Sequence, residues 1–295
     1  MSAPTAHVED WTGKNATVSE IEHELARLRD ASEASDDAPD LRTSVMTHIA
    51  WVPKEWLKAA SETLAGLAER HPSRTILLVP QPESKRDAID AELSLRCFPL
   101  AGQERHVCSE VIELHLLGAR AAAPASVVQP LLISDLPAFL RWRGRPPFGE
   151  PEAEQLLGVA DRLVVDSAEW PDLPGAYAEL AARFDQVGAS DIAWGRGLGW
   201  RISLAGLWPG IAKLRALRVR GPQADALLLA GWLRSRLGVE LELEHEEAET
   251  LAAVTIDGEE VEPPRGERPS ASDLLSEELD RFGRDPIYEA AVAAA

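Results

Sequence analysis

The segment RTSVMTHIAWV, residues 42–52, is followed by KEWLKAASETLAGLAERH, residues 54–71, and then by TILLV, residues 75–79. The first segment alternates like a strand, and the third is a short, wholly apolar run typical of a buried parallel strand. The middle segment has a helical pattern that ends before Pro72. A strand, a helix and a second strand in this order predict a βαβ unit.

The alternation of strands and helices continues along the chain, which predicts an α/β fold class. LVVDS, residues 163–167, reads as another buried strand, and the proline-rich stretch after it as a boundary. We therefore predict two mixed α/β domains with βαβ units, residues 41–168 and residues 169–295. Before them we expect an N-terminal extension, residues 1–40, disordered at first and then helical.

Charge and composition exclude several kinds of partner. The 295 residues contain 30 Lys and Arg against 49 Asp and Glu, and this net charge of −19 repels nucleic acid. No apolar run is long enough to span a membrane, and the amino terminus lacks the pattern of a secretory signal, so we expect a cytoplasmic protein. Residues 240–262 hold ten carboxylates and no Lys or Arg. They indicate either a solvated sheet face or a docking surface for a basic partner.

The two cysteines lie in one predicted hairpin. ELSLRCFPLAGQERHVCSEVIELHL, residues 92–116, reads as two strands around a turn near Gly102. Such a hairpin sets Cys97 opposite Cys108. Cytoplasmic disulfides are rare, so we expect two buried, reduced thiols, with a redox-responsive pair as the alternative.

DIAWGRGLGWR, residues 191–201, contains three alternating glycines. A dinucleotide-binding loop needs GxGxxG between a strand and a helix, but here Trp200 follows Gly199 and no apolar strand leads in. GxSxG, the P-loop and HExxH are also absent, and the histidines have no metal-binding spacing. We therefore expect no enzymatic activity, no cofactor and no metal. The segment is interpreted as a packing element of Trp and Arg in which the glycines are hinges.

Two groups of arginines are candidates for binding an anion or a protein. Arg70, Ser73 and Arg74 could hold an anion, or they could end a helix and start a strand. RWRGRPPFGEP, residues 141–151, would as a strand place Arg141, Arg143 and Arg145 on one face. That face is either solvated or a binding edge.

Nine tryptophans against two tyrosines are the compositional oddity. A tryptophan contributes roughly 150–250 Å² to a core or an interface, so few are left bare without a purpose. Trp232 follows a helical apolar stripe and is expected in the core. Trp142 and Trp208 lie beside helix or strand breakers and are better interface candidates.

Seven segments in order resemble the glucose-6-phosphate dehydrogenase assembly protein family, OpcA, over about residues 40–292. They are RTSVMTHIAWV, ERHPSRTILLV, ASVVQPLLISDLPAFLRWRG, ADRLVVDS, DIAWGRGLGWR, LLLAGWLRSRLG and ELDRFGRDPIYEAAV. The resemblance implies a non-catalytic regulatory subunit that binds glucose-6-phosphate dehydrogenase and promotes its active oligomer or conformation in the oxidative pentose phosphate pathway. The alternative is a sugar-phosphate-binding enzyme or sensor that uses the arginines above.

The candidate partner interface combines the arginine groups with the matched residues of the glycine-containing segment. Its members are Arg70, Ser73, Arg74, Arg141, Trp142, Arg143, Trp194, Arg196, Trp200 and Arg201. Cys97 and Cys108 form the candidate redox pair.

Overall fold

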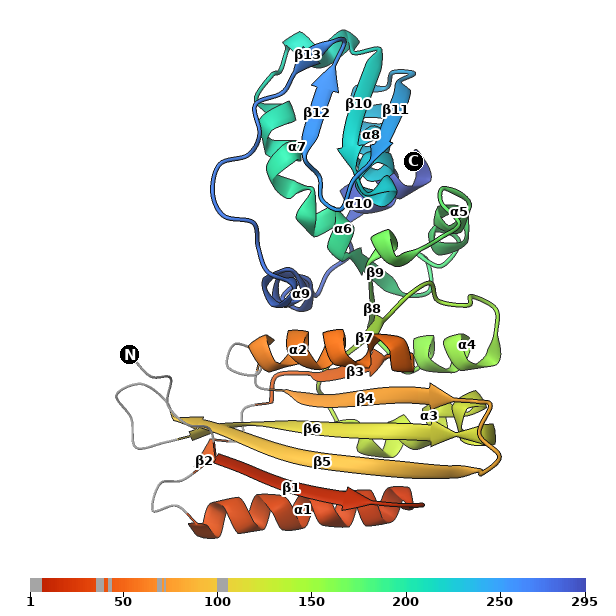
Figure 1. Cartoon of the computed structure of the whole chain (residues 1–295), viewed down its shortest axis with the longest axis vertical. Coiled ribbons are helices and arrows are strands. Elements are labelled where there is room, and N and C mark those ends of the chain that lie inside the picture. Colours follow the sequence, from red (N-terminus) through yellow and green to blue (C-terminus); the bar gives the residue numbers. More distant parts are fainter. Residues whose placement is uncertain (1–6, 36–39, 42–43, 68–70, 72, 100–105) are drawn as a thin grey trace. The chain divides into compact units, whose positions relative to one another are not determined.

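The computed structural model describes residues 7–35, 40–41, 44–67, 71, 73–99 and 106–295 (Figure 1). The chain divides into two compact units. Unit 1 comprises Met1–Arg143 and Gly149–Leu163, and unit 2 comprises Gly144–Phe148 and Val164–Ala295. The predicted domain boundary at residue 168 stays a prediction, because compactness does not test whether each part folds alone.

The predicted βαβ unit is present at the centre of unit 1. β3 (Thr47–Trp51) and β4 (Arg74–Gln81) are parallel neighbours, and α2 (Leu57–Leu67) lies between them in the chain. All five residues of β3 are buried, including the polar Thr47 and His48. β7 (Ala138–Trp142) pairs with β3, also in parallel.

An antiparallel hairpin extends this sheet, so that the strand order in unit 1 is β1-β5-β6-β4-β3-β7. β5 (Ala88–Pro99) and β6 (His106–Leu117) form the hairpin, and β2 (Asp40–Leu41) also pairs with β6. β1 (His7–Gly13) pairs with β5 along its whole length. The expectation of disorder is therefore wrong for His7–Gly13, because this polar strand is stabilised by pairing rather than by its own pattern.

The predicted N-terminal helix is α1 (Val18–Ser35). Thr17 and Glu20 form a capping box at its start, in which each side chain binds the backbone N–H of the other residue. Ile21, Leu25 and Leu28 are buried, as their helical spacing predicts. The remaining helices of unit 1 are η1 (Lys54–Trp56), η2 (Gly118–Ala122), α3 (Pro124–Val128), η3 (Gln129–Leu131) and α4 (Pro151–Leu157).

Unit 2 contains a second βαβ unit. β10 (Ala216–Gly221) and β11 (Glu242–Glu247) are parallel and are connected by α8 (Gln223–Leu237). β12 (Ala253–Ile256) and β13 (Glu259–Glu260) complete the sheet in the order β11-β10-β12-β13. The carboxylates of β11 are exposed, as a solvated face requires. The mixed α/β fold class is confirmed in both units.

Two strands and several helices complete unit 2. β8 (Arg162–Val165), which begins in unit 1, neighbours β9 (Gly188–Asp191). The helices are η4 (Ser167–Glu169), α5 (Gly175–Ala181), α6 (Ile192–Arg196), α7 (Leu198–Ala205), η5 (Gly210–Lys213), α9 (Ala271–Leu279) and α10 (Pro286–Ala293).

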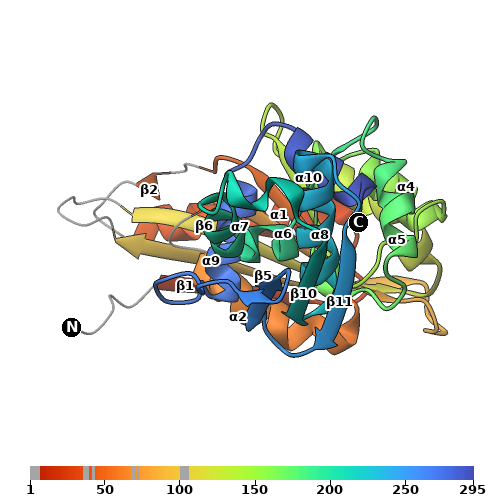
Figure 2. The ribbon, with the colours of Figure 1, turned by 90° about the horizontal axis from the view of Figure 1, so that it is seen from above.

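Unit 2 has a continuous apolar core beneath its sheet. Trp200 and Leu204 of α7 pack there with apolar residues of β10, α8 and β12, and Trp232 is partly buried against the same core. α10 lies beside α8 in both views of the ribbon (Figures 1 and 2). A Cβ atom at Gly231 would lie 2.1 Å from the carbonyl oxygen of Ala291, so glycine lets the two helices approach closely.

Candidate functional site

The segment DIAWGRGLGWR folds as the end of β9 followed by the two short helices α6 and α7, with Gly197 between them. Asp191 ends the strand and caps α6. Its Oδ1 accepts hydrogen bonds from the backbone N–H groups of Ala193 at 2.9 Å and Ser167 at 3.0 Å. A carboxylate of the chain itself therefore occupies the helix amino terminus, where a phosphate would bind in a nucleotide loop.

The three glycines of this segment permit close packing. A Cβ at Gly195 would lie 2.8 Å from Oε1 of Glu278, and one at Gly199 would lie 2.7 Å from Cβ of Pro264. None of the three has a positive φ, and Gly197 has a φ of −75°. The interpretation of these glycines as hinges stays a prediction, while their helical backbone and close neighbours show that they permit tight packing.

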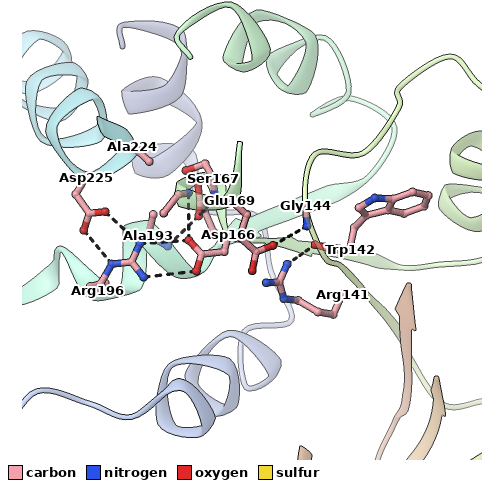
Figure 3. A network of polar contacts seen from close by, with 12 residues as sticks. Arg141, Trp142, Gly144, Asp166, Ser167, Glu169, Ala193, Arg196, Ala224 and Asp225 are labelled. Carbon is pink, nitrogen blue, oxygen red and sulfur yellow. Dashed lines mark hydrogen bonds and ion pairs between the residues drawn. The ribbon is translucent and has the colours of Figure 1, made fainter. Parts of the chain in front are cut away.

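Arg196 lies between the carboxylates of Asp166 and Asp225 in unit 2 (Figure 3). Its Nε is 3.0 Å from Oδ1 of Asp225, and its Nη2 is 3.2 Å from Oδ1 of Asp166. The side chain of Asp225 is fully buried, and its pKa is raised by burial against the opposing effect of Arg196. Burial alone would lower the pKa of Arg196, but the two carboxylates have the larger, opposite effect. The pKa of Arg196 therefore lies above its usual value, and the guanidinium stays charged.

A second buried carboxylate lies next to this ion-pair network. Burial, together with the charge of Asp166, raises the pKa of Asp191 to about 7. The Tyr288 hydroxyl donates to Oδ2 of Asp191 at 3.4 Å, and the hydroxyls of Ser167 and Tyr177 are 2.9 Å apart. Asp191 and Ser167 have no exposed surface, so a substrate cannot reach them in this structure. The group functions as a buried polar network that links η4, β9, α6 and α8.

The Trp and Arg side chains of the segment also pack inside unit 2. The Cζ atom of Arg201 lies 3.4 Å from the centre of the Trp194 ring, and its Nη1 donates to the Trp194 carbonyl at 2.6 Å. Burial lowers the pKa of Arg201 to about 10. Trp194, Trp200 and Arg201 are buried. Their prediction as partner-contacting residues is not supported, because the core already contacts these side chains.

The arginines of residues 141–151 do not share one face. β7 ends at Trp142, so the alternation that would align Arg141, Arg143 and Arg145 stops there. Arg141 is buried and donates to the Trp142 carbonyl oxygen. Arg143 stacks 4.6 Å above the Trp56 ring.

Arg145 and Trp142 also have partners within the fold. The guanidinium of Arg145 contacts Asp172 at 2.6 Å and Glu179 at 2.7 Å. Trp142 is buried and stacks on Trp51, with ring centres 4.9 Å apart. The prediction that Arg141, Arg143 and Arg145 share one face is therefore wrong, and Trp142 is a core residue.

Arg74 is part of a buried ion-pair network in unit 1. Its Nε lies 2.7 Å from Oε2 of Glu110, and Arg29 binds the other oxygen of the same carboxylate at 2.5 Å. Although burial raises the pKa of Glu110, the two arginines lower it below its usual value. Ser73 is buried and Arg70 lies outside the described residues. This geometry gives Arg74 a structural partner in place of a bound anion.

His48 is a buried polar group that the sequence did not single out. It lies in β3, and burial, together with the charges of Arg141 and His71, lowers its pKa to about 4. The imidazole is therefore neutral at physiological pH.

Cys97 and Cys108 face each other across the β5–β6 hairpin, as predicted. They form a disulfide, with Cα atoms 4.0 Å apart. The expectation of two reduced thiols is wrong for this structure, since the register that sets the cysteines opposite each other also brings their sulfur atoms within bonding distance.

One exposed apolar surface belongs to unit 2. We define the α7 surface as the side chains of Leu198, Ile202, Leu207 and Trp208, of which Ile202 and Trp208 are each 63% exposed. Trp208 was predicted as an interface candidate, but the other three residues were not singled out. The signal was present, because residues 202–212 contain no charged side chain.

Among the residues that the structure describes, no group of three or more His, Cys, Asp or Glu side chains could hold a metal ion. In the same part of the chain, no helix combines the length and hydropathy that a bilayer crossing requires.

The chain is similar to known proteins over most of its length. The family model described as glucose-6-phosphate dehydrogenase subunit N-terminal domain matches residues 65–182, and the corresponding C-terminal domain model matches residues 187–268. The OxPP cycle protein OpcA of Synechococcus elongatus is 26% identical over 227 residues, which are 72% of this chain and 47% of that protein. The protein of the same name from Nostoc punctiforme is 28% identical over 183 residues, 58% of this chain and 39% of that protein.

The chain thus spans less than half the length of these two curated relatives. The N-terminal domain model precedes the C-terminal domain model along this chain, and together the two models cover parts of both units. The chain therefore belongs to the glucose-6-phosphate dehydrogenase assembly protein family, OpcA.

Proposed function

We propose that this chain is a non-catalytic subunit that binds glucose-6-phosphate dehydrogenase and promotes its active oligomer or conformation in the oxidative pentose phosphate pathway. The observation that carries the proposal is the match of both domain models, residues 65–182 and 187–268, whose descriptions name a subunit of this dehydrogenase.

The polar groups of both units are consistent with a binding role. An enzyme acting on sugar phosphates needs cations that face a substrate, and here two of the candidate arginines bind carboxylates of the chain instead. Arg74 binds Glu110 and Arg196 binds Asp166 and Asp225. These ion pairs link strands and helices within each unit, so they support a stable scaffold that contacts a partner through its surface.

A subunit without catalytic groups changes the dehydrogenase only through its different affinities for the states of that enzyme. To change the ratio of two states tenfold, it must bind one of them about 1.4 kcal/mol more tightly than the other. The proposal therefore predicts that activation saturates with the concentration of this chain.

The test is a titration of the purified chain into the dehydrogenase of the same organism. We expect formation of a complex, measured by analytical ultracentrifugation, and a change in the rate of NADP-dependent glucose 6-phosphate oxidation at the same concentrations. If neither the mass nor the rate changes, the proposal fails. Turnover of a sugar phosphate by the chain alone, or a thermal shift with glucose 6-phosphate alone, would favour the sugar-phosphate enzyme instead.

A further inference from the structure

Helix α7 is apolar on two opposite faces. Trp200 and Leu204 are four residues apart and pack into the core of unit 2. Leu198 and Ile202 are also four residues apart but are offset by two positions, which places them about 200° around the helix. Leu198 is 42% exposed and Ile202 is 63% exposed. A helix on the surface of a monomer usually carries polar side chains on this outer face, so α7 has the pattern of a helix covered on both sides.

The segment after α7 continues this apolar surface. All residues from Ala205 to Gly210 are exposed, and among them Leu207 is 42% and Trp208 is 63% exposed. Arg201, the charged residue of α7, is buried against Trp194 and contributes no charge to the outer face. The four side chains of the α7 surface expose on the order of 300 Å² of apolar area, which is the size of the largest apolar patch on a typical monomer, and such patches are often functional.

We propose that the α7 surface is where this chain contacts glucose-6-phosphate dehydrogenase, an inference that rests on the proposed function. The dehydrogenase must then offer an apolar depression that buries Trp208, and aliphatic side chains that cover Leu198 and Ile202. A standard interface buries about 800 Å² on each partner. The α7 surface supplies the apolar centre of such an interface, and a polar rim supplies the rest.

Exposed charged residues follow the α7 surface in the chain and flank a proline that approaches α7. Pro264 approaches Gly199 of α7, and next to that proline Glu262 and Arg265 form an exposed ion pair with a distance of 3.0 Å. Lys213 is exposed where the charge-free run ends. Exposed charges around an apolar centre are the usual arrangement at interfaces between separately folded proteins.

A second copy of this chain is a poorer occupant of the surface. Each copy carries a net charge of −19, so self-association brings together two strongly acidic molecules. The charge of the chain therefore disfavours self-association. The dehydrogenase is the occupant that the proposed function names, and the α7 surface lies within residues 187–268, which match the C-terminal domain model of its subunit.

The test compares two variants with the parent protein. Leu198→Ser/Ile202→Ser removes the helical part of the surface, and Trp208→Ala removes its tryptophan. Isothermal titration into the dehydrogenase should show at least 10-fold weaker binding for each variant, since a central tryptophan dominates many interfaces. Urea midpoints equal to that of the parent would show that both variants are folded.

Phe282→Ala is the matched control, because Phe282 is also an exposed aromatic residue of unit 2, at 65%. We expect it to bind within twofold of the parent. If the parent binds the dehydrogenase and the α7-surface variants also bind within twofold of it, the assignment of the surface is wrong. The assignment is equally wrong if Phe282→Ala weakens binding as much as those variants do. If the parent chain forms a homodimer and the variants do not, the α7 surface binds a second copy of this chain, and the assignment to the dehydrogenase is wrong. A parent that does not bind the dehydrogenase at all contradicts the proposed function itself.

Discussion

Replacing Arg196 with methionine tests whether the ion-pair network holds unit 2 together. The guanidinium lies within 3.2 Å of oxygens of Asp166 and Asp225, whose side chains are 14% and 0% exposed. Methionine keeps the aliphatic volume but leaves two carboxylates of the network without their cation. Removing one partner of a buried ion pair costs about 3–5 kcal/mol. This is a large part of a total stability of about 5–15 kcal/mol.

The measurement is the free energy of unfolding, from urea denaturation followed by circular dichroism. The matched control is Arg218→Met, which breaks an ion pair with Glu244 in which both side chains are more than 60% exposed. Exposed pairs contribute about 0–1 kcal/mol, so the control should remain close to the parent. If Arg196→Met costs less than about 1 kcal/mol, or no more than the control, the structural function assigned to the network is wrong.

The pH dependence of Arg196→Met gives an independent check. The pKa of Asp225 is already raised by burial, and loss of Arg196 raises it further. A carboxyl group whose folded pKa lies above its unfolded value binds protons more tightly in the folded state. The stability of the variant should therefore fall as the pH rises, and its deficit relative to the parent should shrink between pH 8 and pH 5.

Three further outcomes follow from the structure. The pKa of Asp191 is raised to about 7, so the parent should lose about 2 kcal/mol between pH 5 and pH 7 from this group, and Asp191→Asn should flatten that part of the stability profile. Gly231→Ala should destabilise the protein despite the better helix propensity of alanine, about 1 kcal/mol, because the new Cβ would lie 2.1 Å from the Ala291 carbonyl oxygen; thermal unfolding measures the sign. Trp142→Ala should cost about 3–5 kcal/mol in urea denaturation, since it removes the buried ring stacked on Trp51; a loss below about 1 kcal/mol would contradict its assignment to the core.

Sequence patterns were most informative where a segment is stabilised by its own composition. The βαβ unit was predicted because residues 42–52 alternate like a strand and residues 75–79 form an apolar run typical of a buried parallel strand. The register of Cys97 opposite Cys108 followed from an equally local rule. β1 was missed because its residues His7–Gly13 carry little apolar signal and depend on pairing with β5.

The candidate residues show why a site is harder to predict than an element. The types and positions of the Trp and Arg residues were recognised, but whether each side chain faces solvent depends on residues far away in the chain. Arg196 meets Asp166 and Asp225, 30 and 29 residues away. Trp208 was predicted as an interface candidate and is exposed, whereas Trp142 had the same prediction and lies in the core.

By itself, the sequence determined the fold class and the family, and its charge of −19 excluded nucleic acid as an expected partner. These properties depend on local periodicity, composition and the order of motifs, all of which can be read along a chain. Only the tertiary structure decided which side chains meet. It placed Asp191 at the amino terminus of α6, joined Cys97 to Cys108 and left the apolar outer face of α7 exposed to solvent. Burial and pairing are properties of packed elements, so no single segment contains them.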